Sequence, residues 1–122
     1  MLHELKIFQK TYDLIIYLHP VVNKFPKAEK FVLGQRIENT ALNVLEGIIA
    51  ANQETDKEEI LKKTGVELEK LRMFIRLAKD LKFISIGQYE HTSLMVNEIG
   101  KMLGGLMKKF TPISQSSLLD RG

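Results

Sequence analysis

The sequence lacks cysteine and tryptophan altogether, and it holds only three prolines among its 122 residues. Without cysteine there can be no disulfide, no thiol nucleophile and no cysteine-ligated zinc site. No apolar run approaches the ~18 residues of a membrane-spanning helix, and residues 1–10 do not have the pattern of a signal peptide. We therefore expect a cytoplasmic protein that has no contact with a membrane.

Motifs of known enzyme classes are also missing. The sequence has no glycine-rich phosphate loop, no nucleophile elbow and no HExxH zinc motif. Helical bundles that bind two iron ions use a Glu-x-x-His motif on each of two helices, and this chain has none. Its histidines, His3, His19 and His91, are isolated from one another. These absences predict a protein that is not an enzyme and that binds no metal or cofactor.

The composition is typical of a single globular domain. Apolar residues make up 44% and charged residues 27% of the chain, which is too apolar for a disordered protein. The net charge is +3, and residues 57–82 carry eight basic against five acidic side chains. Such a local excess is more often a solvated helix face, and the alternative interpretation is a surface for a polyanionic partner.

Apolar residues recur at intervals of three and four along four stretches of the chain, as they do on the buried side of a helix. The stretches span residues 4–24, 27–51, 57–82 and 86–109. Pro20 lies inside the first one, where it removes one hydrogen bond and predicts a bend near Ile16–Pro20. Short connections between long helices predict an all-α, up-down-up-down antiparallel four-helix bundle. The bundle occupies residues 1–110, and residues 111–122, which have no period, are predicted to be a disordered tail.

The helical period also predicts which side chains are buried. The expected inner faces of the first, second and fourth stretches are Phe8, Tyr12, Ile15, Leu18 and Val22, then Phe31, Gly34, Ile37, Ala41, Leu45 and Ile48, then Tyr89, Val96, Ile99 and Leu103. Glycines inside these helices are interpreted as points where a neighbouring helix comes close, namely Gly34, Gly47, Gly100 and Gly104.

Glu38 falls inside the apolar arc of the second stretch, and a buried carboxylate needs a partner. In an antiparallel pairing about residues 52–56 it lies level with Arg72, so we expect these two side chains to pair. A catalytic acid is the alternative. Capping boxes are predicted at two helix starts, by Thr55 with Glu58 or Asp56 with Glu59, and by Ser85 with Gln88.

Residues 66–81 divide into three faces on a helical wheel. The arc expected to be buried holds Leu68, Leu71, Phe74, Ile75 and Ala78. A basic flank holds Arg72, Arg76 and Lys79, and a second apolar arc holds Val66, Met73 and Leu77. Because a helix in a lone bundle needs only one apolar face, the second arc predicts an interface between copies of the chain, and hence a homo-oligomer.

Three stretches taken together resemble one family. YDLIIYLHPVVNKFPKAEKFVLGQRIEN at residues 12–39 resembles the four-helix-bundle family that contains ribosomal-RNA intervening-sequence proteins and Avd, the accessory variability determinant of diversity-generating retroelements. LEKLRMFIRLAKDLKFIS at residues 68–85 and QYEHTSLMVNEIGKMLGG at residues 88–105 are more similar to the Avd branch. The resemblance covers about residues 5–109.

The resemblance implies a protein that is not an enzyme and that assembles as a pentamer. It implies that the protein binds a reverse transcriptase and nucleic acid, either RNA or cDNA, and supports mutagenic reverse transcription. By residue type it places the basic surface at Arg72, Arg76 and Lys79, extended by Lys82, Lys101 and Lys108. One alternative is an intervening-sequence-type bundle with no polymerase partner, and another, from a different class, is a small enzyme or metal-binding bundle.

Overall fold

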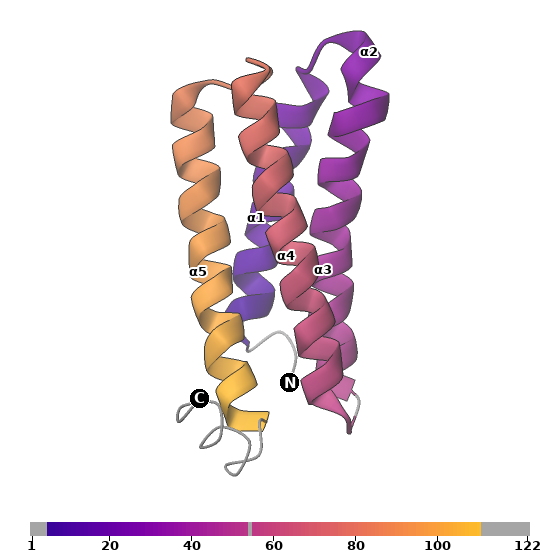
Figure 1. The fold of residues 1–122 in the computed structure, drawn as a ribbon, viewed down its shortest axis with the longest axis vertical. Coiled ribbons are helices and arrows are strands. Elements are labelled where there is room, and N and C mark those ends of the chain that lie inside the picture. Colours follow the sequence, from indigo (N-terminus) through magenta and orange to yellow (C-terminus); the bar gives the residue numbers. More distant parts are fainter. Residues whose placement is uncertain (1–4, 54, 111–122) are drawn as a thin grey trace, which may run out of the picture.

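The computed structural model describes residues 5–53 and 55–110, which form an antiparallel bundle of four long helices (Figure 1). The long helices are α1 (Lys6–Asn23), α3 (Gln35–Gln53), α4 (Lys57–Asp80) and α5 (Ile86–Phe110). A short helix, α2 (Lys27–Glu29), and a π-helix, η2 (Lys30–Gly34), precede α3. Successive long helices run in opposite directions, so the predicted all-α, up-down-up-down bundle is confirmed. Glu4 and the predicted tail, residues 111–122, lie outside the described residues.

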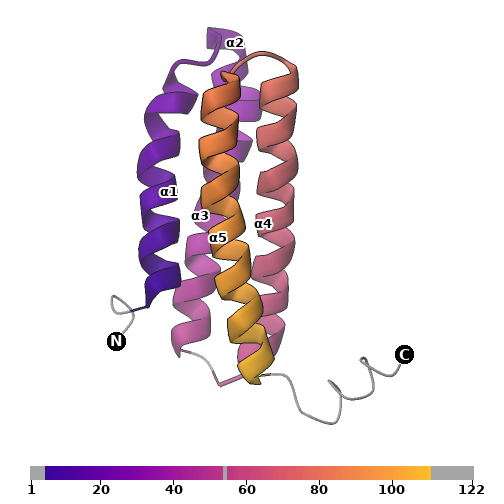
Figure 2. The same ribbon diagram turned by 90° about the vertical axis from the view of Figure 1, so that its left-hand side faces the viewer.

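Each long helix packs against two others around a shared core. Helix α1 contacts α3 and α5, and α4 contacts the same two helices, so that α1 and α4 lie diagonally across the bundle (Figures 1 and 2). Burying one large aliphatic side chain contributes about 1.5–3 kcal/mol to folding. The largest fully buried apolar side chains come from all four helices: Leu14, Leu18, Ile37, Val44, Leu61, Leu71, Val96 and Ile99.

The predicted inner face is correct for four of the five α4 residues, with Phe74 only half-buried, and it is partly correct for α1. On α4, the buried apolar side chains include Leu68, Leu71, Ile75 and Ala78. On α1, Tyr12 is exposed and Phe8 and Ile15 are half-buried, against the prediction. The apolar side chains buried on α1 are Ile7, Leu14, Leu18, Val21 and Val22.

One threonine from each long helix lies in the core, and these threonines explain the error on α1. They are Thr11, Thr40, Thr64 and Thr92. Each hydroxyl donates to the backbone carbonyl four residues earlier in its own helix, at 2.6–2.8 Å, so that it can be buried at little cost. Counting only apolar side chains passes over Thr11 and shifts the predicted face of α1 toward Phe8 and Tyr12.

Two local predictions concern the proline inside α1 and the cap at the start of α5. Helix α1 is continuous through Pro20, and the bend expected there stays a prediction. At the start of α5 the predicted capping box is confirmed. The Ser85 amide donates to Gln88 Oε1 at 2.9 Å, and the Gln88 amide donates to Ser85 Oγ at 3.0 Å.

The capping box predicted at the start of α4 is wrong. Asp56 occupies the N-cap position, but its side chain makes no capping hydrogen bond. Glu58 pairs instead with Lys62 at 3.3 Å, one turn further along the helix. Helix α4 also ends at Asp80, earlier than predicted, because the backbone then turns into the left-handed region at Lys82, where φ is 66°.

Two of the four glycines predicted to permit close approach lie at tight contacts. A Cβ added at Gly34 would stand 2.8 Å from Val22 Cγ1, and one at Gly47 would overlap the side chain of Thr64. Gly100 is less crowded, with Leu68 Cδ2 at 3.6 Å from the same position. The prediction is wrong for Gly104, where no atom lies within 4 Å, because α4 does not reach this part of α5 closely.

The π-helix η2 overturns the prediction for Phe31. The expected inner face extends the α-helical period of α3 backward through Gly34 to Phe31, but a π-helix closes its hydrogen bonds over five residues. The wider turn changes the direction in which side chains leave the backbone. Leu33 and Gly34 face the core, and Phe31 is 74% exposed.

Candidate docking surface on helix α4

Helix α4 keeps an apolar strip on the side that faces away from the bundle. Among residues 5–53 and 55–110 its long-helix neighbours are α3 and α5, and neither covers the strip. Val66, Met73 and Leu77 lie there with exposed fractions of 56%, 55% and 45%. The structure therefore places all three residues of the predicted second arc at the surface. We call Val66, Met73 and Leu77 the outer strip.

Polar contacts on both sides fix the rotation of α4 about its own axis. Toward α3, the amide of Asn43 donates to Glu67 Oε1 at 2.7 Å, and Lys70 Nζ pairs with Glu67 Oε2 at 2.8 Å. Toward α5, the guanidinium of Arg72 donates to Asn97 Oδ1. Because the helix is tied on both flanks, the outer strip cannot turn inward without breaking these contacts.

The hydrogen bonds to Glu67 also act on its charge. The bond from Lys70, followed by the bond from Asn43, lowers the pKa of the Glu67 carboxyl below its ordinary value. The carboxylate therefore stays ionised, and keeps both partners, at any pH near neutrality.

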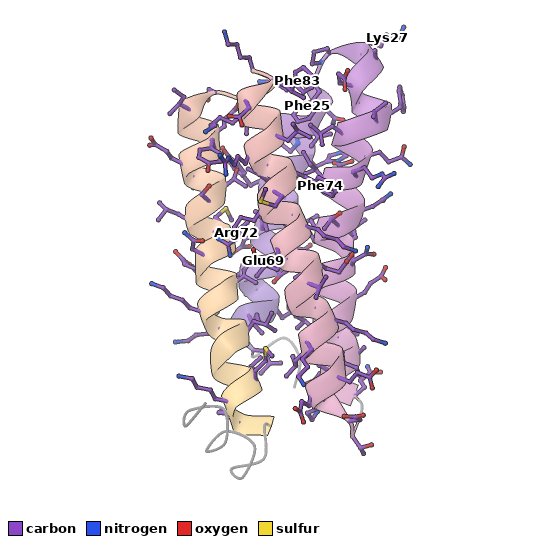
Figure 3. All side chains as sticks on the ribbon, in the orientation of Figure 1. Phe25, Lys27, Glu69, Arg72, Phe74 and Phe83 are labelled. Carbon is purple, nitrogen blue, oxygen red and sulfur yellow. The ribbon has the colours of Figure 1, made fainter. Side chains whose placement is uncertain are left out.

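The basic flank of α4 is partly neutralised within the chain. Arg72 donates through Nε to Glu69 Oε1 at 3.2 Å, and Figure 3 shows these two side chains together on α4. Arg76 Nε lies 3.9 Å from Asp80 Oδ2, and Lys79 Nζ lies 3.4 Å from Asp80 Oδ1. Lys79 also sits 4.5 Å above the ring of Tyr89 on α5. Arg76 thus has the loosest of these contacts and is the cation most free to meet a partner.

The three lysines predicted to extend the basic surface lie at different positions along the bundle. Lys101 lines a groove of about 580 Å³ between α4 and α5 together with Arg72, so these two belong to one surface. Lys82 lies in the α4–α5 connection, at one end of the bundle. Lys108 stands seven residues beyond Lys101, about 10 Å further along α5 and toward the other end. All three are exposed.

The predicted ion pair between Glu38 and Arg72 is wrong. Glu38 Oε1 lies 2.6 Å from His19 Nδ1, and Arg72 is engaged with Glu69 and Asn97. Along the bundle axis, Glu38 and Arg72 lie at about the same level, as the antiparallel register of α3 and α4 requires. Glu38, however, lies on the side of α3 that faces α1. Arg72 lies on the side of α4 that faces α5. Glu38 therefore contacts His19 of α1, whereas Arg72 donates to Asn97 of α5.

No candidate metal-binding cluster accompanies this surface within the described residues. Groups of three or more histidine, aspartate or glutamate side chains that could hold a metal ion do not occur among residues 5–53 and 55–110. His19 is engaged with Glu38, and His91 packs against the ring of Tyr17 with centroids 4.5 Å apart. In the same residues, no helix is long and apolar enough to cross a membrane.

Comparison with known proteins places the fold and the family. A family model described as bAvd-like matches residues 5–110. The chain belongs to the bAvd-like family. Among solved structures, this bAvd-like chain is similar to a protein of unknown function from the S23 ribosomal protein family of Bacteroides thetaiotaomicron. The TM-score is 0.77 at 20% identity, over 84% of this chain and 95% of the other, a likeness that shows the shared fold. No curated protein matches the chain.

Phe31 is the surface residue that sequence reasoning missed. It was assigned to the core, yet it has the highest exposed fraction of the large apolar side chains in the described residues. Its neighbours in the sequence, Lys27 and Lys30, offered a signal, because a basic run around an aromatic residue is unusual for a core segment.

Proposed function

We propose that this bAvd-like protein is a non-enzymatic accessory protein of a diversity-generating retroelement. It binds the retroelement's reverse transcriptase and nucleic acid, and it supports mutagenic reverse transcription. Membership of the bAvd-like family supports the accessory role. The single structural observation that carries the proposal is the pairing, on one helix, of the uncovered outer strip with a basic flank.

The outer strip serves to join copies of the chain, as a pentamer by resemblance to the family. Fully burying a Val, Leu or Met side chain contributes about 1.5–3 kcal/mol, so burying the exposed half of three such side chains contributes about 2–4 kcal/mol per copy. Most homo-oligomers close into rings or dimers, in which every copy buries the same strip. Each copy in a ring therefore gains this contribution from its neighbours.

The basic flank is the surface that contacts the nucleic acid or the transcriptase. The contact between Arg76 and Asp80 is long and exposed, and such surface ion pairs contribute at most about 1 kcal/mol. Arg76 can therefore exchange Asp80 for a phosphate or for a carboxylate of the transcriptase at little cost. Arg72 and Lys79 are held more firmly and give the flank its fixed position.

A first test is genomic. A reverse-transcriptase gene and a pair of template and variable repeats beside this gene would support the proposal. Their absence from the flanking sequence would contradict it and would favour the intervening-sequence-type alternative.

A second test uses the purified chain and the transcriptase encoded beside it. Arg76→Glu should weaken their association on the order of tenfold and make it less sensitive to salt. Lys63→Glu is the matched control, because Lys63 is an exposed cation on the same helix that is paired one turn away, with Glu59 at 3.5 Å. Equal binding by both variants would contradict the role of the flank, provided that circular dichroism shows both to be folded.

A further inference from the structure

The end of the bundle that carries α2 presents an exposed aromatic ring. Phe31 is 74% exposed, whereas Leu33, two residues on, is buried. Val32, beside Phe31, is 62% exposed. Single exposed apolar side chains are common on folded proteins, so the exposure of Phe31 gains meaning from the charges of the same segment. Figure 1 places α2 at the same end as the α4–α5 connection.

The backbone fixes Phe31 in this exposed position. Gly34 closes η2 against α1, where a Cβ would stand 2.8 Å from Val22 Cγ1 and 3.5 Å from Phe25 Cδ2. Phe25 in turn packs against Phe83 of the α4–α5 connection, with ring centroids 5.5 Å apart (Figure 3). With Leu33 and Gly34 held inside the bundle, the preceding π-helical turn directs Phe31 outward.

The segment around Phe31 also carries a local excess of positive charge, as residues 57–82 do. Residues 24–36 hold four basic side chains and one acidic, an excess of three that equals the net charge of the whole sequence, +3. Each cation of the α4 flank has a carboxylate partner, at 3.2–3.9 Å. Among the residues that the structure describes, by contrast, no ion pair is made by the basic side chains of this segment, Lys24, Lys27, Lys30 and Arg36.

Two of these cations are close to Phe31 in the sequence, Lys27 exposed and Lys30 half-buried. Lys30 precedes Phe31 directly, and Lys27 lies four residues before it, about one helical turn away. Lys27 points away from the bundle at its upper edge in Figure 3. Lys82, in the α4–α5 connection, adds a further exposed cation at the same end of the bundle.

We propose that Phe31, Lys27 and Lys30 form a binding site for single-stranded nucleic acid, in which a base stacks on Phe31 and the two lysines contact flanking phosphates. The site rests on the proposed function for its biological context. An exposed ring, with neighbouring lysines that make no ion pair among the described residues, matches the combination that sequence-tolerant single-strand sites use, because every base has a face that can stack. A protein partner would call for a broader apolar patch. In this segment Val32 is exposed beside Phe31, and Ile86 at the start of α5 is exposed at the same end of the bundle, so the transcriptase is tested below as the competing partner.

The charges at the α2 end also favour single-stranded nucleic acid as the ligand. A nucleic-acid strand brings one negative charge per nucleotide, and it releases counterions when unpaired lysines replace them. A paired cation must first lose its own carboxylate, so the α2 end has the advantage over the α4 flank for a phosphate backbone. A duplex does not fit as well, because its bases are already stacked on one another and are not available to Phe31.

The test measures fluorescence anisotropy of the full chain with two labelled probes, a 20-nucleotide single-stranded RNA of mixed sequence and a 20-base-pair duplex. Phe31→Ala should weaken single-strand binding by about 5- to 150-fold, the range for loss of one stacked base. The same variant should change duplex binding less than about twofold, and Phe31→Trp should keep full single-strand affinity. Lys27→Gln combined with Lys30→Gln should reduce the slope of log K against log salt by about 1.4.

Two controls separate the site from general effects. Ile86→Ala removes another exposed apolar side chain from the same end of the bundle, and it should leave binding unchanged. Lys62→Gln with Lys63→Gln removes two cations that are already paired with glutamates, and it should change the salt slope less than the loss of Lys27 and Lys30.

The outcomes distinguish this site from the proposed function. Unchanged single-strand affinity in Phe31→Ala, with binding lost in Arg76→Glu, would overturn the site and leave the proposed function standing. A wild-type chain that binds neither probe at 50 mM salt would overturn both the site and the nucleic-acid part of the proposed function. If Phe31→Ala loses the transcriptase but keeps the single strand, the α2 end is a protein interface and the site is wrong.

Discussion

Replacing Gly47 with alanine should destabilise the bundle, although alanine is the better helix former. The added methyl group would overlap Thr64 Oγ1 and would stand 3.1 Å from Thr64 Cβ and 3.2 Å from its Cγ2. Thr64 has no free space to move into, because it is buried on α4 and its hydroxyl donates to the Ile60 carbonyl at 2.8 Å. The methyl group must therefore push α3 and α4 apart.

The expected magnitude is the difference between two opposing effects. Overpacking of a filled core costs about 1–3 kcal/mol, and replacing glycine by alanine inside a helix returns about 1 kcal/mol. Gly104→Ala is the matched control, since no atom lies within 4 Å of the new methyl group and only the favourable effect remains. The two variants should therefore differ by about 1–3 kcal/mol, with Gly104→Ala the more stable.

Thermal unfolding followed by circular dichroism measures this difference. For a domain of this size, 1 kcal/mol corresponds to about 4 °C in Tm, so the two variants should differ by about 4–12 °C at equal protein concentration. Adding Thr64→Ala to Gly47→Ala should recover part of the loss, since it removes two of the three crowded atoms. If both glycine variants gain stability equally, the close contact of α3 with α4 at this point is wrong.

Two further predictions concern pH and capping. The pKa of Glu67 is lowered in the folded state, so its contribution to stability is present above the ordinary glutamate value of about 4.3 and is lost as the pH falls through the lowered value. The Tm of the wild type should therefore fall more steeply than that of Glu67→Gln between pH 6 and pH 3, and parallel curves would contradict the contacts of Glu67 with Lys70 and Asn43. Ser85→Ala removes the acceptor for the Gln88 amide and should cost about 1 kcal/mol in urea unfolding. Ser93→Ala, a change within the same helix, should cost less, and equal losses would argue against the capping box.

The sequence predicted features that depend on one helix at a time. The buried arc of α4 and the capping of α5 by Ser85 and Gln88 follow from spacing along a single segment, and both are confirmed except at Phe74, which is half-buried. Two other features depended on more than one helix or on an irregular turn. The partner of Glu38 required knowing which neighbour each side of α3 faces, and the exposure of Phe31 required knowing that the helix widens at η2.

The candidate site was likewise predicted only in part. Spacing alone placed Val66, Met73 and Leu77 on a separate arc, and the structure leaves all three uncovered. Spacing also placed Arg72, Arg76 and Lys79 on one flank, and it held a signal for the partners of the two arginines, since Glu69 and Asp80 lie three and four residues away on the same helix. Whether such a pair forms depends on side-chain rotamers, which a helical wheel does not contain, whereas the bond from Arg72 to Asn97 depends on the neighbouring helix α5.

The mass of the chain in solution tests the account most directly. Light scattering of the wild type at micromolar concentration should give a mass several times that of the 14.0 kDa chain, close to five times for a pentamer. Met73→Glu with Leu77→Glu places charges on the outer strip and should reduce the mass to that of a single folded chain. A wild-type mass of 14 kDa, or a large mass that the double variant leaves unchanged, would contradict the role of the outer strip as the surface that joins the copies.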